Sequence, residues 1–146
     1  MLAWSPLASG FLTGKYTREN PAPEDARRNK FNFPPIDVEK GYDVVAALGG
    51  VAQRMGSTPA QVALAWLLTR PFVSTVIIGA TSTRQLEENL KAASVTLTPE
   101  DVAGLDELTR PQPLYPGWMQ PMGWDVKVKE AMEAPSPPPP SRGGIQ

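Results

Sequence analysis

Two short apolar segments constrain the fold of this chain most strongly, because they have the composition of buried β-strands. Met1–Trp4 is apolar without alternation and ends at Ser5-Pro6, and residues 73–79 (VSTVIIG) form a β-branched run. Runs of this kind are typical of strands in a parallel sheet that is covered on both faces. The segment between them is long enough for the helical crossover that parallel strands require. The pattern therefore predicts a parallel α/β arrangement.

Two helices are predicted between these strands. In residues 38–55 the apolar positions recur at helical spacing, and Gly56 suits the C′ position that follows a helix. The next helix, 58–70, opens on a capping box formed by Thr58 and Gln61, with a proline at its first helical position. Its body is apolar nearly all round, so we expect this helix to be mostly buried.

Two further helices are predicted after the second strand. A second capping box, Ser82 with Gln85, opens a helix over 82–93. Its buried stripe is expected at Leu86, Leu90 and Ala93, and its exposed side carries an i,i+4 pair of Glu87 and Lys91. A last helix is expected over 99–109, with Val102, Leu105 and Leu108 facing inward.

The remaining segments are polar or rich in proline. Residues 17–37 (TRENPAPEDARRNKFNFPPID) are predicted to be a long irregular loop, and loops of that length in compact domains are usually functional lids or disordered. Residues 126–146 form a proline-rich tail that we expect to be extended and disordered. Pro137, Pro140 and Arg142 match a P-x-x-P-x-R ligand, but five prolines in a short stretch make that match nearly automatic, so a solvated tail is favoured.

Composition excludes several classes of function. The net charge is −1, from 14 basic and 15 acidic residues, so no strong field is available to bind nucleic acid. The longest apolar stretch, near Val62–Leu68, is too short to cross a bilayer, and no membrane insertion is expected. The chain has neither cysteine nor histidine, which removes disulfides, thiolate chemistry and the commonest metal ligand and general acid–base group. We expect no metal site and a reducing, cytoplasmic location.

Four stretches resemble one enzyme family, in the family's order and at compatible spacing. They are WSPLASGFLTGKY (4–16), TPAQVALAWLL (58–68), VIIGATSTRQLEENL (76–90) and YPGW (115–118). Together they resemble the C-terminal part of the aldo-keto reductases. The resemblance covers roughly residues 1–125, which gives a predicted domain boundary between 125 and 126.

The family folds as a (β/α)₈ barrel. The resemblance implies that Met1–Ser5 matches the seventh barrel strand and Val76–Gly79 the eighth. It also implies that 58–70 and 82–93 are barrel helices. Residues 38–55 and 99–109 then form two extra helices outside the barrel. The expected fold is therefore α/β, the C-terminal portion of a (β/α)₈ TIM barrel. Two parallel strands cannot close a barrel, so this fold is incomplete as given.

In this family a nicotinamide cofactor, usually NADP(H) and in some members NAD(H), lies over the C-terminal face of the barrel. Phosphates sit near the last two strands and a helix N-terminus in such barrels. The resemblance implies that the cofactor-binding residues of this chain are Trp4 (stacking on nicotinamide), Ser5, Leu7, Ser9 and Gly10 (pyrophosphate loop), Lys15 (phosphate), Arg28 (from the lid), Gly79 and Thr81 (adenosine), Gln85 (2′-phosphate), and Glu88 and Asn89 (adenine).

Each of these residues also has a purely structural interpretation. Trp4 can be a core aromatic, Lys15 and Arg28 can be solvated loop charges, and Gln85 is explained by its capping box. Asn89 is harder to explain structurally, because asparagine is a mediocre residue in the middle of a helix. Many relatives that read the 2′-phosphate have a basic residue at the Gln85 position, so the neighbouring Arg84 is the candidate substitute and NAD stays open as an alternative.

Catalytic residues are not predicted in this chain. The family reduces aldehydes or ketones by hydride transfer, using a tyrosine acid with lysine, aspartate and usually histidine, all from the first half of the barrel. None of Tyr16, Tyr42 and Tyr115 matches the catalytic position. Tyr115 and Trp118 resemble the C-terminal loop that shapes the substrate pocket.

Three hypotheses follow from the resemblance. The first is a portion of an NAD(P)H-dependent aldo-keto reductase that keeps cofactor-binding loops but lacks catalytic residues. The second is a non-catalytic, cofactor-sensing module that resembles the potassium-channel β-subunits of this family. The third is a partial domain completed by a partner chain that supplies the missing barrel half. Unpaired edges of two apolar strands predict aggregation of the isolated chain.

Overall fold

The computed structural model describes residues 1–24, 27–31 and 33–111. The chain divides into two units, Met1–Arg110 and Pro111–Gln146, and the fold described below is that of the first. The predictions for Tyr115, Trp118, the domain boundary after residue 125 and the proline-rich tail lie outside the described residues.

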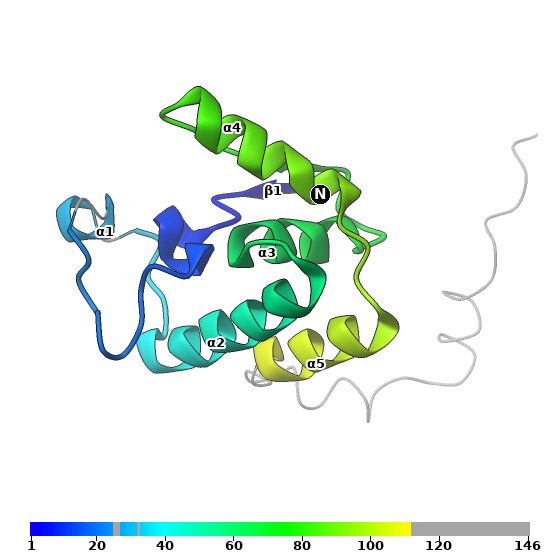
Figure 1. The fold of residues 1–146 in the computed structure, drawn as a ribbon, viewed down its shortest axis with the longest axis horizontal. Helices are drawn as coiled ribbons and strands as arrows, with labels where there is room; N and C mark the ends of the chain where they lie inside the picture. The colour runs from blue at the N-terminus through cyan, green and yellow to red at the C-terminus, as the bar shows by residue number, and fades with distance from the viewer. Residues whose placement is uncertain (25–26, 32, 112–146) are drawn as a thin grey trace, which may run out of the picture. The chain divides into compact units, whose positions relative to one another are not determined.

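In the first unit each of the two strands is followed by helices, and α2, α3, α4 and α5 come in the predicted order (Figure 1). Its elements are β1 (Leu2–Trp4), the 3₁₀ helix η1 (Ala8–Thr13), α1 (Arg27–Lys30), α2 (Val38–Met55), α3 (Pro59–Leu68), β2 (Thr75–Ile77), α4 (Thr83–Leu90), the 3₁₀ helix η2 (Lys91–Ser94) and α5 (Pro99–Thr109). Residues 17–37, predicted to be wholly irregular, contain the short helix α1.

The strands β1 and β2 pair in parallel, which confirms the α/β prediction. Leu2 lies opposite Thr75, Ala3 opposite Val76 and Trp4 opposite Ile77. Because side chains alternate along a strand, Leu2, Trp4 and Ile77 share one face of this small sheet and Val76 lies on the other. The Val76 face is turned toward α3, since Val76 lines a cavity together with Leu64 and Leu68.

The prediction that Met1–Trp4 is buried is wrong for one face of the sheet. Leu2 is 64 % exposed, Trp4 65 % and Ile77 47 %, although the sequence is that of a strand covered on both sides. No described element packs on this face, whereas α3 covers the opposite one. Side chains suited to a barrel interior are therefore open to solvent in the described part of the chain.

The core lies among α2, α3 and α5. It is formed by six buried apolar side chains, Leu48, Val51, Ala52, Val62, Ala63 and Leu105. The predicted signals that begin and end these helices are confirmed. Gly56 adopts a left-handed conformation after α2, with φ of 61°, and the capping box of Thr58 and Gln61 is complete. Figure 1 shows α3 between β1 and α2, so the helical layer supports one face of the sheet.

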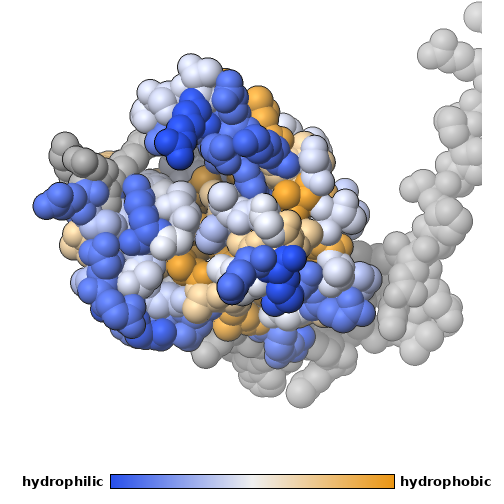
Figure 2. Space-filling view, in the orientation of Figure 1, coloured by the Kyte–Doolittle hydropathy of each residue, from blue (hydrophilic) through white to orange (hydrophobic). Residues whose placement is uncertain are grey.

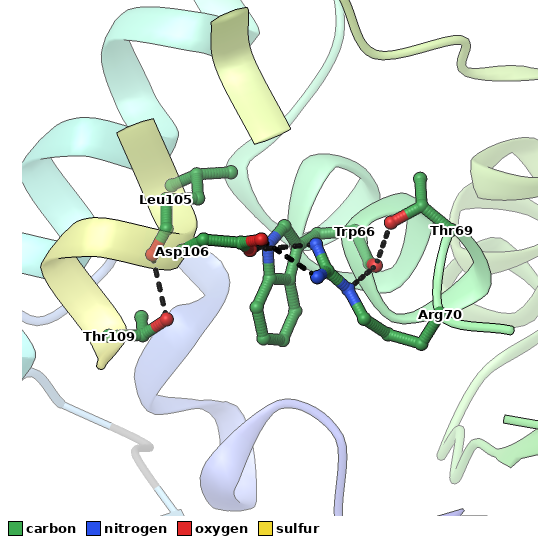
Figure 3. A network of polar contacts seen from close by, with 6 residues as sticks. All are labelled: Trp66, Thr69, Arg70, Leu105, Asp106 and Thr109. Atoms are coloured by element: carbon green, nitrogen blue, oxygen red, sulfur yellow. Dashed lines mark hydrogen bonds and ion pairs between the residues drawn. The ribbon is translucent and has the colours of Figure 1, made fainter. Parts of the chain in front are cut away.

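A polar cluster joins α3 to α5 (Figure 3). The Trp66 indole Nε1 donates to Asp106 Oδ1 at 2.8 Å, and the Arg70 guanidinium donates to both Asp106 oxygens at 2.7 and 2.9 Å. The Arg70 guanidinium also lies 4.3 Å from the centre of the Trp66 ring. The hydrogen bonds from Arg70 hold the pKa of Asp106 below its usual value. This cluster fixes α5 against the C-terminal half of α3.

Three predictions for residues 82–93 are wrong. The helix α4 ends at Leu90 and continues as η2, and Lys91 pairs with Glu88 instead of Glu87. The stripe expected to be buried is open: Leu86 is 42 % and Leu90 58 % exposed, and α4 has no buried residue. Figure 2 shows a mainly hydrophilic surface over α4, with apolar surface beside it. The helix is amphipathic as predicted, but the described part of the chain leaves Leu86 and Leu90 largely open, and Leu90 lines a cavity between α4, α3 and β2.

No helix in the described ranges is long and apolar enough to cross a membrane.

Candidate functional site

The two loops singled out by the sequence follow the carboxyl ends of two paired parallel strands. One runs from Ser5 to Lys15 after β1, and the other from 78 to 82 between β2 and α4. Because Trp4 pairs with Ile77, both loops leave the sheet at the same edge. Ligands of parallel α/β folds bind at this edge, so the topology brings together the two halves of the predicted site.

The loop after β1 has an unusual backbone. Ser5, Ala8 and Ser9 are not glycines, yet they adopt left-handed conformations with φ of 52°, 47° and 56°. Gly10 follows with φ of 88°. Non-glycine residues in this region carry strain of about 1–3 kcal/mol each and cluster at ligand sites. The loop is held in this shape by its own hydrogen bonds, from Ala8 N to Ser5 O at 2.9 Å and from Gly10 N to Leu7 O at 2.9 Å.

Lys15 lies against this strained backbone. Its Cε and Nζ atoms are 3.6 and 3.7 Å from the position that a Cβ on Gly10 would occupy. The ammonium group is 5.9 Å from the centre of the Tyr16 ring. No carboxylate in the described part of the chain forms an ion pair with it. Lys15 therefore places a cation beside the backbone of Gly10.

The segment around α1 is tied to the same loop. The Arg28 guanidinium Nη1 donates to Ala8 O at 3.3 Å and to Pro34 O at 2.9 Å, and its plane lies 5.8 Å from the Phe11 ring centre. The Ser9 hydroxyl donates to Phe33 O. Arg28 and Ser9, both predicted to bind the cofactor, thus also connect residues 27–34 to η1.

An aromatic cluster stands at the end of β1. The rings of Trp4 and Phe33 are 5.7 Å apart, and those of Phe33 and Phe31 are 5.8 Å apart. All three side chains are exposed. The sequence indicates a site role for Trp4 alone, because Phe33 falls in a segment predicted to be irregular and no local pattern indicates that the two rings are in contact. Trp4 thus presents an open aromatic face at the edge where both loops begin.

The loop after β2 is organised by Gln85. Its side-chain oxygen accepts from Thr81 N and from Thr81 Oγ1, both at 2.9 Å, while Ser82 Oγ accepts from Gln85 N at 3.3 Å. One of the two predicted capping-box bonds is therefore present, from Gln85 N to Ser82 Oγ. The other is wrong, because the Gln85 side chain bonds Thr81 and not the backbone of Ser82. A Cβ on Gly79 would meet no atom within 4 Å, so the backbone there is open to a close approach.

Glu88 and Asn89 lie in the last turn of α4. The Glu88 carboxylate accepts from Lys91 Nζ at 3.0 Å and from Gln61 Nε2 at 3.2 Å. The hydrogen bond from Lys91 is the main reason that the pKa of Glu88 lies below its usual value. Asn89 lines an open cavity of about 220 Å³ between α3, α4 and β2.

The tyrosines of the described residues lie in a buried cluster around Phe11, a residue of the loop after β1. Tyr16 and Tyr42 pack with Phe11, with ring centres 5.0 and 5.6 Å from the Phe11 ring. Both tyrosines are buried, and the Tyr16 hydroxyl accepts from Arg28 N at 3.3 Å. Their positions are explained by packing.

Comparison with known proteins identifies the family. A model of the "Aldo/keto reductase family" matches residues 1–110. The chain belongs to the aldo/keto reductase family. This confirms the resemblance, and the family's fold is the (β/α)₈ barrel, to which the two parallel strands and surrounding helices of this α/β chain correspond in part.

Curated aldo/keto reductase relatives match most of the chain. A "Probable voltage-gated potassium channel subunit beta" of Oryza sativa is 40% identical over 119 residues, which are 77% of this chain and 36% of the relative. "Aldo-keto reductase str7" of Strobilurus tenacellus is 40% identical over 109 residues, 74% of this chain and 32% of the relative. "L-glyceraldehyde 3-phosphate reductase" of Escherichia coli is 36% identical over 113 residues, 73% and 32% respectively. The chain spans about a third of the length of these relatives.

Sequence reasoning missed one residue that links the site to the helical layer. The sequence predicts that Gln61 completes a capping box, which it does, but its amide nitrogen also donates to Glu88 on α4. The residue stands among apolar neighbours in a helix that is buried nearly all round, and a glutamine in that setting signals a polar partner. The identity of the partner, 27 positions away, is visible only in the structure.

Proposed function

We propose that this chain is the C-terminal, cofactor-binding part of an NAD(P)H-dependent aldo-keto reductase barrel. In this proposal β1 and β2 are the last two barrel strands, α3 and α4 their helices, and α2 and α5 the two extra helices. The parallel pairing of β1 with β2 carries the proposal, because it brings the loops of Ser5–Lys15 and 78–82 to one edge.

The residues at this edge suit a dinucleotide phosphate. Lys15 offers a cation to the pyrophosphate beside the backbone of Gly10, and Ser5, Leu7 and Ser9 belong to the same loop. Trp4 offers an exposed ring for stacking on nicotinamide, which supplies the hydride when the cofactor is bound. Gly79, Thr81, Gln85, Glu88 and Asn89 form the adenosine side, with Arg84 as the cation for a 2′-phosphate. Arg28 joins the lid to the phosphate loop through Ala8 O.

The exposed face of the sheet supports the inference that this chain is only part of a barrel. Leu2, Trp4 and Ile77 are exposed on a face that would be packed in a closed barrel, and the apolar stripe of α4 is exposed as well. We infer that six further strands cover both surfaces and supply the tyrosine acid that reduces an aldehyde or ketone. The 146-residue chain alone is then inactive as a reductase. A cytoplasmic location and a domain boundary after residue 125 belong to the same proposal.

Calorimetric titration of the 146-residue chain with NADP⁺ and with NAD⁺ tests the cofactor claim. We expect one binding site for NADP⁺, and no consumption of NADPH at 340 nm when an aromatic aldehyde is added. Absence of heat with both dinucleotides at millimolar concentration would refute cofactor binding. Steady turnover by the chain alone would refute the claim that catalytic groups lie elsewhere.

A second candidate function is a non-catalytic module that binds the same cofactor and senses its redox state. The 40% identity to the relative named as a potassium channel subunit beta favours it. Isolation of the native protein with an antibody against the tail distinguishes the two functions. Bound dinucleotide with turnover of carbonyl substrates supports the reductase, and bound dinucleotide without turnover supports the sensor.

The same isolation identifies the source of the missing strands. A native polypeptide near the size of a whole barrel would place them in one chain with these residues. A native polypeptide of this size that copurifies with a second protein would support a partner chain. A native 146-residue polypeptide that copurifies with no other protein and reduces carbonyl substrates would refute the inference that further strands are needed.

A further inference from the structure

Gln61 is the one polar residue with a buried side chain in the part of the chain that the structure describes, at 5 % exposure. Its amide forms three hydrogen bonds. Oε1 accepts from Thr58 N at 3.1 Å, and Nε2 donates to Glu88 O at 2.9 Å and to Glu88 Oε2 at 3.2 Å. The capping box explains the first bond and nothing in α3 explains the other two, which cross to α4.

The orientation of this amide is fixed by its surroundings. A backbone N–H can only donate, so the amide atom that faces Thr58 N is the oxygen and the nitrogen faces Glu88. Both hydrogens of Nε2 then have acceptors on Glu88, one on the main chain and one on the side chain. Gln61 therefore restrains both the backbone of Glu88 and one oxygen of its carboxylate.

The Glu88 carboxylate is held at both oxygens and keeps accepting capacity. Oε2 accepts from Gln61, and Oε1 accepts from Lys91 Nζ at 3.0 Å. An ionised carboxylate has about four lone-pair sites, so two remain for a ligand. A carboxylate restrained in this way accepts in defined directions and loses little conformational entropy when a ligand binds.

The helix α4 buries little of its own surface in the described part of the chain, and the η2 segment that follows it packs against α3. The helix α4 contains no buried residue, and its apolar side chains Leu86 and Leu90 are exposed. Gln61 supplies the hydrogen bonds from α3 to α4 in the described structure. Of the two groups that hold the Glu88 carboxylate, Gln61 lies in the buried helix α3 and Lys91 in η2.

We propose that Gln61 is a positioning residue that sets base selectivity at the adenosine end of the cofactor site, by aiming the Glu88 carboxylate at the exocyclic amine of adenine. This inference rests on the proposed function. Adenine presents an amine donor at its 6-position, which a carboxylate oxygen accepts. Hypoxanthine presents a carbonyl acceptor at the same position, which a carboxylate repels. A correctly aimed Glu88 therefore favours the adenine dinucleotide over its hypoxanthine analogue.

The test measures the affinity of the 146-residue chain for NADP⁺ and for nicotinamide hypoxanthine dinucleotide phosphate. The readout is the ratio of the two dissociation constants on one protein sample. Partial unfolding scales both constants by the same factor, so the ratio is insensitive to it. We expect the unaltered chain to prefer NADP⁺ by about tenfold, the value of one hydrogen bond to a charged group.

Gln61→Met removes the amide and keeps a side chain of similar length. We expect it to bring the ratio close to one. The same substitution at Gln53, which is exposed on α2, is the matched control and leaves the ratio unchanged. Glu88→Gln is expected to abolish the preference, and its control is Glu87→Gln on the neighbouring position. In the Glu88→Gln background, Gln61→Met has no further effect on the ratio, because both act through one carboxylate.

The outcomes separate the two proposals. Failure of the unaltered chain to bind either dinucleotide refutes the proposed function and this inference with it. Binding with a preference that Gln61→Met leaves intact refutes the positioning role alone. A Gln61→Met effect of equal size on both dinucleotides, with an unchanged ratio, shows that Gln61 supports only the fold.

Discussion

Two glycines of α2 make a matched pair for the packing of the phosphate loop. An alanine Cβ at Gly41 would lie 2.7 Å from Phe11 Cε1 and 3.1 Å from Cζ, whereas at Gly49 it would meet no atom within 4 Å. Phe11 belongs to η1, is 3 % exposed and stacks on Tyr16, so its ring has no free space into which to move. The same substitution is therefore expected to have opposite effects at two positions of one helix.

The sign of each effect on the free energy of unfolding follows from comparing the gain in helix propensity with the cost of the clash. Replacing an interior helical glycine by alanine stabilises a helix by about 1 kcal/mol. Gly49→Ala gains this amount without a clash. Gly41→Ala gains it too, but overpacking against a buried ring costs about 1–3 kcal/mol. We expect Gly41→Ala to lower the free energy of unfolding by about 1 kcal/mol, so that the two variants differ by roughly 2 kcal/mol.

Urea unfolding followed by far-ultraviolet circular dichroism, at low protein concentration to limit aggregation, measures the two free energies. Equal midpoints for Gly41→Ala and Gly49→Ala would refute the packing of η1 against α2. The same result would count against the proposed pyrophosphate loop, because Phe11 is adjacent to Gly10 in that loop.

Three further predictions concern the caps, the polar cluster and the phosphate cation. Thr58→Ala removes the hydroxyl that accepts from Gln61 N and should lower the free energy of unfolding by about 1 kcal/mol in the same urea assay, with an unchanged midpoint arguing against the cap. Hydrogen bonds from Arg70 are the main reason that the pKa of Asp106 is lower in the folded than in the unfolded chain. The Asp106 carboxylate therefore contributes its full stabilisation above the unfolded pKa of about 3.9. This contribution is lost as the pH falls through the lower pKa of the folded chain. Asp106→Asn should make the free energy of unfolding depend less on pH in the acid range. An unchanged dependence would contradict the contribution of Asp106 to stability. Lys15→Met should weaken NADP⁺ binding, whereas Lys40→Met, whose ammonium donates to Arg110 O, should not; equal affinities of the two variants would contradict the role of Lys15.

The local part of the fold could be predicted from sequence. Capping residues and apolar spacing are short-range signals, and they located α2, α3 and α5 and the left-handed Gly56 that ends α2. The parallel pairing followed from the composition of two segments and the length of the crossover between them. Such features depend on neighbours a few positions away, so one sequence contains most of the information.

The rest depends on contacts between distant residues. The apolar spacing of Leu86 and Leu90 was predicted correctly, yet their burial depends on distant elements, and the described part of the chain leaves both side chains largely open. The amide of Gln61 was placed correctly at a helix N-terminus, but its bonds to Glu88 connect positions 27 apart. For the candidate site, the resemblance named the two loops, and the structure adds their common edge and the strained backbone at Ser5, Ala8 and Ser9.

The central claim is that the loops after β1 and β2 bind one dinucleotide together. Amide chemical shifts of the 146-residue chain, followed by NMR during titration with NADP⁺, test it most directly. The account predicts that signals from Ser5–Lys15 and from 79–89 shift with a single dissociation constant. Shifts confined to other segments, or no shifts at millimolar NADP⁺, would contradict it.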